Sequence, residues 1–383
     1  MMPRQSAVEE SPAVFTAASK VGSDDPLCGI VLAGGEGKRL RSFIHLLRKD
    51  LLPKQYVNFI GRRSMLEHTF HRAQKIIDSK RLFTVLNKTH LRFPEVEKQI
   101  RSRPPETIVV QPENRETGPG LLLPLMHVAK YHPNSVVAVF PSDHFVLEEA
   151  TLMKYVHRSH LIVKKDPSRL VLLGIEPERE ESQYGYIVPA KASKRPTKAF
   201  PVSCFLEKPA SESIPDLIHR GALWNTMIMV FRPDALLEVV RKVIPHIHLL
   251  FRRIYDAIGT ARQEKVVEEI YAQLRPVNLS KEILEPFVQA HPSKVLAMPV
   301  RGVLWSDWGT ETRVLEVLRQ TGSMSRLNGL SLAAPDPLAT WIMSGHREPT
   351  ERPLHHKSSI SVGPKRRKRS ARIASFAGGS ALG

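Results

Sequence analysis

Cysteine is scarce in this chain: the 383 residues contain two, Cys28 and Cys204. Each lies inside an apolar, strand-like run, so neither a disulfide framework nor a cysteine metal cluster is expected. Long hydrophobic runs are also missing, since no stretch reaches the roughly 18 apolar residues that a transmembrane helix needs. The first residues lack the apolar core of a signal peptide. These absences favour a cytoplasmic location and no membrane partner.

Acidic residues are outnumbered: 38 Asp and Glu stand against 56 Lys and Arg, which gives a net charge of +18. A basic run, KRRKR at 365–369, lies in a tail rich in serine, glycine and alanine. Such a cluster is a weak indication of specific recognition, so a nucleic-acid partner is not expected. The other bases are spread along the chain, where a phosphate-handling site would also attract them.

Short β-branched runs alternate with longer amphipathic ones over the first half of the chain. Strands are predicted at 29–33, 82–86, 107–110, 136–140 and 169–174, and helices at 64–77, 119–131 and 150–165. This alternation predicts an α/β fold with a Rossmann-like, mainly parallel twisted sheet flanked by helices. Later runs, YGYIVPA, VSCFLEKP and ALWNTMIMVF, predict an antiparallel addition to the sheet. Further helices are expected at 233–241 and 261–274.

The changes in composition divide the chain into three regions. We expect a disordered leader over 1–26, one folded domain over 27–321, and a basic, largely disordered tail over 322–383.

The first candidate loop is VLAGGEGKRL at 31–40, because ligands of an open α/β sheet bind beyond the carboxyl ends of its strands. Leu40 stands where the dinucleotide-binding pattern needs a glycine, and Arg39 stands where a Walker A loop needs Ser or Thr. Three glycines would still let backbone N–H groups approach a phosphate beside the charges of Lys38 and Arg39. These glycines are Gly34, Gly35 and Gly37. A plain tight turn is the alternative.

Two further loops carry polar residues suited to a nucleotide. Lys54 in LLPKQYVNF is a compact charge that suits a phosphate oxygen, although an ordinary surface lysine is the commoner outcome. The segment QPENRETGPG at 111–120 is rich in amide, acid and glycine, as a loop that reads a base or a ribose should be.

Carboxylates end three other apolar runs. Asp143 in FPSDHF is placed to bind magnesium, with a helix cap as the alternative role. FLEKPA brings Glu207 and Lys208 to a strand end, and LWSDWGTETR holds Asp307 between two tryptophans.

Taken in order, LAGGEGKRL, PKQ, PENRETGP, PSDH, YGYI, EKP, WN and SDWGT resemble the sugar-1-phosphate nucleotidylyltransferases, and most of all their mannose-1-phosphate guanylyltransferase branch. The resemblance covers about Cys28 to Leu318. It implies a nucleotide-diphospho-sugar transferase-like fold and an enzyme that transfers a nucleotidyl group from GTP to mannose 1-phosphate with Mg²⁺. The alternatives are another base or hexose, or a catalytically weak regulator that binds nucleotide sugars. A homo-oligomer is left open.

The resemblance also implies residue roles. Arg39, Lys54 and Asp143 would be catalytic, and Asp143 with Asp307 would hold one Mg²⁺. The nucleotide would contact Ala33, Gly34, Gly35, Gly37, Glu113, Asn114 and Thr117. The sugar phosphate would contact Gly185, Glu207, Lys208 and Asn225. The chain departs from the family after WN, where Thr226 and Met227 replace the usual small residue and glycine.

Overall fold

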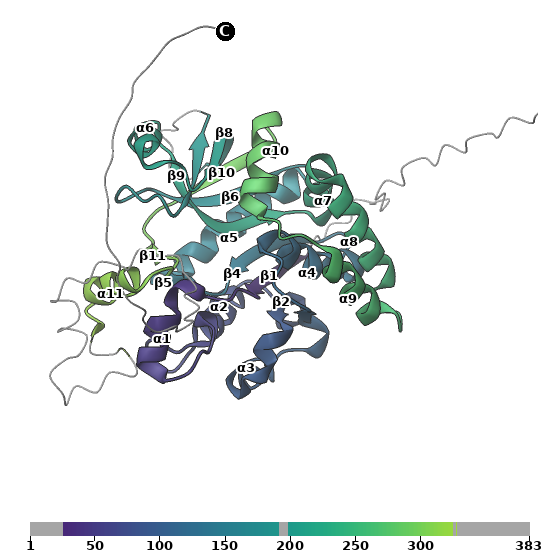
Figure 1. Ribbon diagram of the computed structural model, residues 1–383. Helices are drawn as coiled ribbons and strands as arrows, with labels where there is room; N and C mark the ends of the chain where they lie inside the picture. Colours follow the sequence, from purple (N-terminus) through teal and green to yellow (C-terminus); the bar gives the residue numbers. More distant parts are fainter. Residues whose placement is uncertain (1–25, 191–197, 325–326, 328–383) are drawn as a thin grey trace, which may run out of the picture. The chain divides into compact units, whose positions relative to one another are not determined.

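The computed structural model describes residues 26–190, 198–324 and 327 (Figure 1). Nearly all of the predicted leader, 1–26, and most of the predicted tail, 322–383, lie outside these residues. The predicted division of the chain therefore stays a prediction at both ends.

A mixed sheet in the order β3-β2-β1-β4-β9-β6-β10-β8-β7 forms the centre of the fold (Figure 1). Its strands are β1 (Leu27–Ala33), β2 (Leu82–Asn87), β3 (Ile108–Gln111), β4 (Val136–Pro141), β6 (Leu170–Ile175), β7 (Gly185–Pro189), β8 (Phe200–Glu207), β9 (Leu223–Phe231) and β10 (Val295–Val300). Strands β1 to β4 are mutually parallel, and β6 is parallel to β10. A separate ribbon pairs β5 (Phe145–Val146) with β11 (Trp305–Ser306). The α/β fold is thus confirmed.

Strand β9 is antiparallel, as predicted, but it lies at the centre of the sheet. It pairs with β4 on one side and with β6 on the other, so it joins the two parallel groups. All of its residues except Met227 are buried, which suits a strand covered on both faces. The antiparallel addition consists of β7 and β8, which pair at the edge of the sheet.

The helices agree with most of the predicted ones. They are α1 (Arg41–Arg48), α2 (Met65–Ala73), α3 (Pro94–Ile100), α4 (Thr117–Tyr131), α5 (Glu149–Lys165), α6 (Ile214–His219), α7 (Pro233–Val243), α8 (Pro245–Ala257), α9 (Gln263–Gln273), α10 (Glu285–Ala290) and α11 (Glu311–Gln320). Single-turn helices include η1 (Lys38–Leu40) and η2 (Lys54–Tyr56), and η7 (Leu279–Leu284) is a π-helix. The predicted helix over 64–77 ends earlier, at Ala73, and α8 was not predicted.

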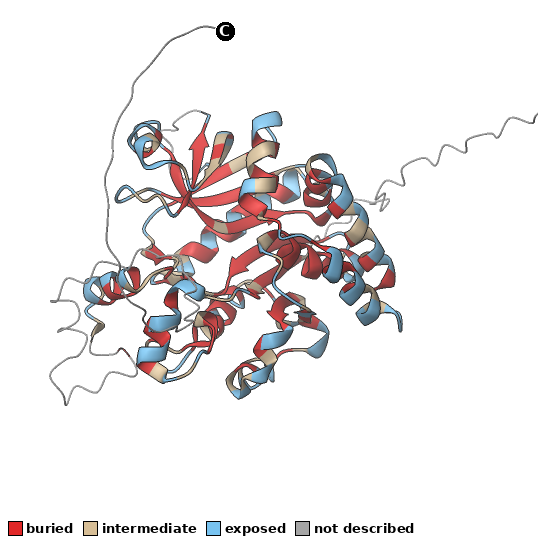
Figure 2. Cartoon of the chain, in the orientation of Figure 1, coloured by how far each residue is buried: buried red, intermediate tan, exposed pale blue. Residues whose placement is uncertain are grey.

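Helices cover both faces of the sheet. Helices α2 and α5 pack together on one face, while α4, α7 and α8 pack on the other. Figure 2 shows the strands buried between these layers. The core includes Met229 and Phe231 of β9, which are fully buried. No helix in the described part of the chain is both long and apolar enough to cross a bilayer.

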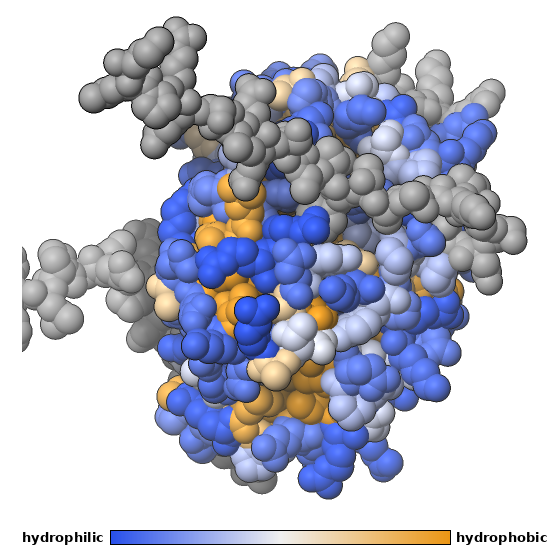
Figure 3. Space-filling model, turned by 90° about the vertical axis from the view of Figure 1, so that its right-hand side faces the viewer, coloured by the Kyte–Doolittle hydropathy of each residue, from blue (hydrophilic) through white to orange (hydrophobic). Residues whose placement is uncertain are grey.

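The side of the molecule seen in Figure 3 is mostly hydrophilic, with hydrophobic patches between the polar residues. Single large apolar side chains reach solvent on the described surface, including Leu249 of α8, which is 64% exposed. Isolated exposed residues of this kind are normal on a monomer. The possible homo-oligomer therefore stays a prediction.

The central position of β9 places its side chains inside a packed layer of the core. We expect Phe231→Ala to lower the free energy of unfolding by about 3–5 kcal/mol, because it leaves a cavity inside a packed layer. Leu249→Ala, on the exposed face of α8, is the matched control and should change it by less than about 0.5 kcal/mol. Chemical denaturation measures both, and equal losses would contradict the central placement of β9.

Candidate active site

A cavity of about 330 Å³ opens where several chain segments meet at one edge of the sheet. The carboxyl ends of β1, β4 and β8 reach this edge, and the antiparallel β9 and β7 bring their first residues to it. The predicted site residues that line the cavity are Gly35, Gly37, Arg39, Thr117, Asp143, Gly185, Glu207, Lys208, Asn225 and Asp307. The structure thus brings together residues that are distant in the sequence.

Other predicted site residues lie outside the cavity lining. The carbonyl of Ala33 accepts hydrogen bonds from Gln55 Nε2 at 2.8 Å and from the Tyr56 hydroxyl at 2.9 Å. Glu113 is paired with Arg115 at 2.6 Å, and Asn114 Oδ1 accepts from the backbone N–H of Glu116 at 2.9 Å. Glu113 and Asn114 therefore have partners in their own loop, and their contact with a nucleotide stays a prediction.

Hydrogen bonds from the single-turn helix η2 hold the glycine loop after β1 in place. Gln55 Nε2 donates to the carbonyls of Ala33 and Gly35, both at 2.8 Å. Gly37 has a φ of 60°, in the left-handed region that favours glycine. A side chain there would also come within 3.3 Å of the backbone nitrogen of Lys54. The loop is therefore held against η2 with its other side toward the cavity. Gln55 stands in the quoted PKQ motif but was not among the predicted site residues.

Gln111, at the end of β3, is a second residue that the predictions left out. A Cβ atom on Gly34 would lie 2.5 Å from Gln111 Nε2, so this glycine permits the amide to approach the loop. Gln111 is 1% exposed, and its Oε1 has no hydrogen-bond partner within the described part of the chain. A buried amide without its partner is costly unless a ligand completes it. Gln111 opens the QPENRETGPG segment, which is the signal that could have identified it.

Lys54 joins the two aspartate-bearing segments. Its Nζ lies 2.9 Å from Asp143 Oδ2 and donates to the carbonyls of Asp307 and Trp308, both at 3.2 Å. Burial opposes ionisation of Asp143, but the Lys54 ammonium outweighs it and holds the pKa of this carboxyl below its ordinary value. Asp143 is thus a carboxylate at neutral pH.

Arg313 of α11 does the same for Asp307. Its Nη1 lies 2.9 Å from Asp307 Oδ1 and 3.0 Å from Oδ2. Burial again opposes ionisation, and Arg313 keeps the pKa of Asp307 below its ordinary value. The guanidinium also pairs with Glu181 at 2.8 Å and lies 4.4 Å from the centre of the Tyr184 ring. This role was not predicted, because one arginine on a helix usually faces solvent.

The two carboxylates fit the predicted magnesium site in their chemistry. Both are ionised, both line the same cavity, and oxygen donors are the ligands that Mg²⁺ prefers. The described residues contain no group of three or more His, Cys, Asp or Glu that could hold a metal. Two carboxylates plus phosphate oxygens are a common set for magnesium, which usually binds with its substrate.

His144, next to Asp143, does not add a positive charge. Burial lowers the pKa of His144 to about 4, so the ring is neutral at neutral pH. Its Nδ1 accepts a hydrogen bond from Trp305 Nε1 at 3.2 Å. The residue supports the turn that carries Asp143.

The other end of the cavity is formed by β7, β8 and β9. Gly185 pairs with Glu207, and a Cβ atom on Gly185 would lie 2.7 Å from Glu207 Oε2. The absence of a side chain at 185 therefore makes room for this carboxylate. Burial raises the pKa of Glu207 above its ordinary value.

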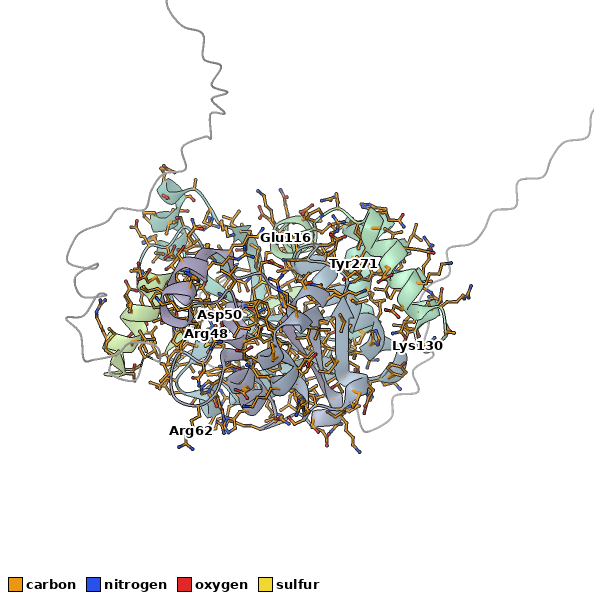
Figure 4. All side chains as sticks on the ribbon, turned by 60° about the horizontal axis from the view of Figure 1, so that its bottom comes forward. Arg48, Asp50, Arg62, Glu116, Lys130 and Tyr271 are labelled. Carbon is orange, nitrogen blue, oxygen red and sulfur yellow. The ribbon has the colours of Figure 1, made fainter. Side chains whose placement is uncertain are left out.

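Three non-glycine residues that line the cavity have positive φ angles: Glu116 at 69°, Lys208 at 49° and Met227 at 56°. Figure 4 labels Glu116, which directly precedes α4. Such backbone conformations are unfavourable for residues with a side chain and cluster at functional sites.

The comparisons with known proteins agree with this arrangement. A model of the nucleotidyl transferase family matches residues 28–323. The chain belongs to the nucleotidyl transferase family. It is 29% identical over 307 residues to mannose-1-phosphate guanylyltransferase 2 of Escherichia coli O157:H7, covering 75% of this chain and 59% of the relative. It is 26% identical over 304 residues to the xanthan biosynthesis protein XanB of Xanthomonas campestris pv. campestris (strain B100), covering 78% and 61%. The chain thus spans about three-fifths of the length of these relatives.

Solved structures support the fold of this family member. A mannose-1-phosphate geranyltransferase from Thermus thermophilus matches with a TM-score of 0.60 and 24% identity, over 74% of this chain and 76% of that one. A mannose-6-phosphate isomerase from Helicobacter pylori matches with a TM-score of 0.57 and 18% identity, over 73% and 99%. At these identities the likeness extends to the fold alone.

Arg313 offers a test of the site's construction. Arg313→Met should lower the free energy of unfolding by about 3–5 kcal/mol, because Asp307 and Glu181 would lose a buried partner. Arg313→Lys should recover part of this loss, since lysine lacks the fork that reaches both carboxylates. Arg319→Met, on the exposed face of the same helix, is the control. Denaturation curves measure all three, and a harmless Arg313→Met would contradict the arrangement.

Proposed function

We propose that the protein transfers a nucleotidyl group from a nucleoside triphosphate to a sugar 1-phosphate and releases pyrophosphate. GTP and mannose 1-phosphate are the first candidates, because two of the relatives are named as mannose-1-phosphate guanylyltransferases. The observation that carries the proposal is the junction at Lys54, which contacts the Asp143 carboxylate and the backbone carbonyl of Asp307. Both aspartates line the same cavity as the glycine loop and Glu207.

The glycine loop suits the nucleotide. Gly35 and Gly37 line the cavity, so backbone N–H groups can approach a phosphate without interference from side chains. Arg39 follows them and is 51% exposed, which leaves its guanidinium able to reach the outer phosphates. Gln111 lies against Gly34 of this loop, and its buried amide oxygen has no partner within the described part of the chain.

The reaction is an in-line substitution at the α-phosphorus. An oxygen of the sugar phosphate forms the new bond to phosphorus, and the bond from phosphorus to the bridging oxygen of the β-phosphate breaks. Lys54 stabilises the negative charge that builds up at the α-phosphate, while Lys208 and Glu207 orient the phosphate and the hydroxyls of the sugar. Asp143 and Asp307 would hold Mg²⁺, which when bound neutralises charge on the phosphates.

A regulator that binds nucleotide sugars without turnover is the second candidate. The observation that favours it is Met227, which occupies a position with glycine-like backbone in the sugar half of the cavity. The presence of both aspartates beside Lys54 favours the enzyme, since binding alone has less need of them.

Pyrophosphate release measured with a matrix of nucleoside triphosphates and sugar 1-phosphates in the presence of Mg²⁺ tests the proposal. We expect turnover with at least one pair. Lys54→Met should lower kcat about 10²–10³-fold, the effect of losing one preorganised donor. Lys242→Met, which changes an exposed lysine on α7, is the matched control and should leave kcat unchanged. Silence across the whole matrix with folded protein would refute catalysis.

The pKa of Glu207 gives a prediction about pH. Burial raises this pKa most, Glu285 adds to it, and Lys208 and Ser280 offset part of the rise. As the pH falls through the raised pKa, Glu207 takes up a proton, loses its charge and becomes a weaker acceptor for sugar hydroxyls. KM for the sugar phosphate should therefore increase on mild acidification, at a higher pH than for an exposed glutamate.

Glu207→Gln tests this assignment, because it resembles the protonated form. Its KM should be high at every pH and should lose the acid-dependent rise. Glu212→Gln, which changes an exposed glutamate in the turn after β8, is the control. If KM for the sugar phosphate rises in the same way on acidification in the wild type and in Glu207→Gln, a group other than Glu207 causes the rise.

A further inference from the structure

Met227 lies on an irregularity of β9 at the cavity. Strand β9 advances four residues from Asn225 to Met229, where its neighbour β6 advances two from Leu172 to Gly174. The extra residues bulge out of the ladder, as happens next to functional sites, where bulges redirect a side chain. The side chain of Met227 lines the cavity together with Glu207 and Lys208.

The backbone at Met227 is strained for a residue with a side chain. Its φ is 56°, in the left-handed region where glycine is favoured. Thr226 fixes the bulge, because its hydroxyl donates to the carbonyl of Leu173 at 2.7 Å and accepts from the backbone N–H of Ile228 at 3.3 Å. A strained conformation that the surroundings enforce in this way suggests a function for the side chain it carries.

Met227 also contacts the polar groups around it. Its backbone N–H donates to Asn225 Oδ1 at 3.1 Å, and its sulfur lies 3.4 Å from Asn225 Nδ2. The hydroxyl of Ser280, in the π-helix η7, lies 3.2 Å from the same sulfur. The thioether therefore occupies the space between β9 and η7, and it covers one side of the Asn225 amide.

We propose that Met227 determines which sugars the cavity accepts. This inference rests on the proposed function and deepens it. The thioether offers a sugar an apolar surface and little room, so it selects a sugar 1-phosphate that presents ring C–H groups toward the Met227 side chain, beside Asn225 and Ser280. A sugar with a bulky substituent at that position, such as an acetamido group, is excluded by steric overlap.

Met227→Gly tests the inference, because glycine relieves the backbone and removes the side chain. The substrates are unsubstituted hexose 1-phosphates and their acetamido derivatives at different ring positions. We expect kcat/KM for at least one acetamido derivative to gain about tenfold or more relative to its parent sugar, the scale on which pockets discriminate groups of this size. Met227→Leu, which keeps the bulk without the sulfur, should retain the wild-type preference.

Met227→Ala guards against a folding defect, since it removes the bulk but keeps a side chain on the strained backbone. The increase in Tm that each sugar phosphate produces is measured on the same variants, and this needs no turnover. Unchanged preferences of Met227→Gly and Met227→Ala, in folded protein, would overturn the inference even if the wild type is active. If the wild type is inactive with every pair, the proposed function fails, and an unchanged binding preference in the Tm measurements then refutes the role of Met227 separately.

Discussion

The site depends on one ammonium group. Lys54 contacts the Asp143 carboxylate and the backbone carbonyls of Asp307 and Trp308, so it joins three segments that are far apart in the sequence. Two carboxylates that line one cavity repel each other and would raise each other's pKa. A cation between their segments removes that penalty. The position of η2, which carries Lys54, is in turn fixed because Gln55 holds the loop after β1. The packing of η2 against the loop after β1 therefore also fixes the position of the positive charge in the site.

Two buried arginines form hydrogen bonds with the turns that carry Asp143 and Asp307. Arg72 of α2 is 3% exposed, and its Nη2 donates to the carbonyl of His144 and to the Thr69 hydroxyl at 3.0 and 2.7 Å. Burial lowers the pKa of Arg72 to about 10, which still leaves it charged at neutral pH. Arg313 holds the other turn through the Asp307 carboxylate itself. Each turn is thus bonded to a helix, and this contact fixes the position of the aspartate that the turn carries.

Features that depend on a short stretch of sequence could be predicted, whereas features that depend on distant contacts could not. The strand before Asp143 was identified because VVAVF is apolar throughout and a polar turn follows at once. The central place of β9 could not be predicted, since a continuous apolar strand has the same pattern next to any buried neighbour. Helix α8 was missed although Pro245 begins it and Ile247, Phe251 and Ile254 form its buried face, because histidines interrupt the apolar spacing. The role of Arg313 depends on contacts with Asp307 and Glu181 in other elements, which no local pattern encodes. Gln111 differs, because it opens the polar QPENRETGPG segment that had already been singled out.

The arginines of the site differ in how firmly they are paired with carboxylates. A firmly paired arginine stabilises the structure, whereas a weakly paired one is available to bind a substrate. Arg313 is 5% exposed at its side chain and makes short contacts with two carboxylates, so moving it would leave buried charges without partners. Arg39 is 51% exposed, and its nearest contact with Asp307 is 4.0 Å, which at such exposure contributes little. Turning Arg39 away from Asp307 toward a phosphate therefore loses almost nothing, whereas the same movement of Arg313 would dismantle the turn. Under the proposed function, the glycine loop would present this cation to the triphosphate, while the buried arginines keep the carboxylates in place.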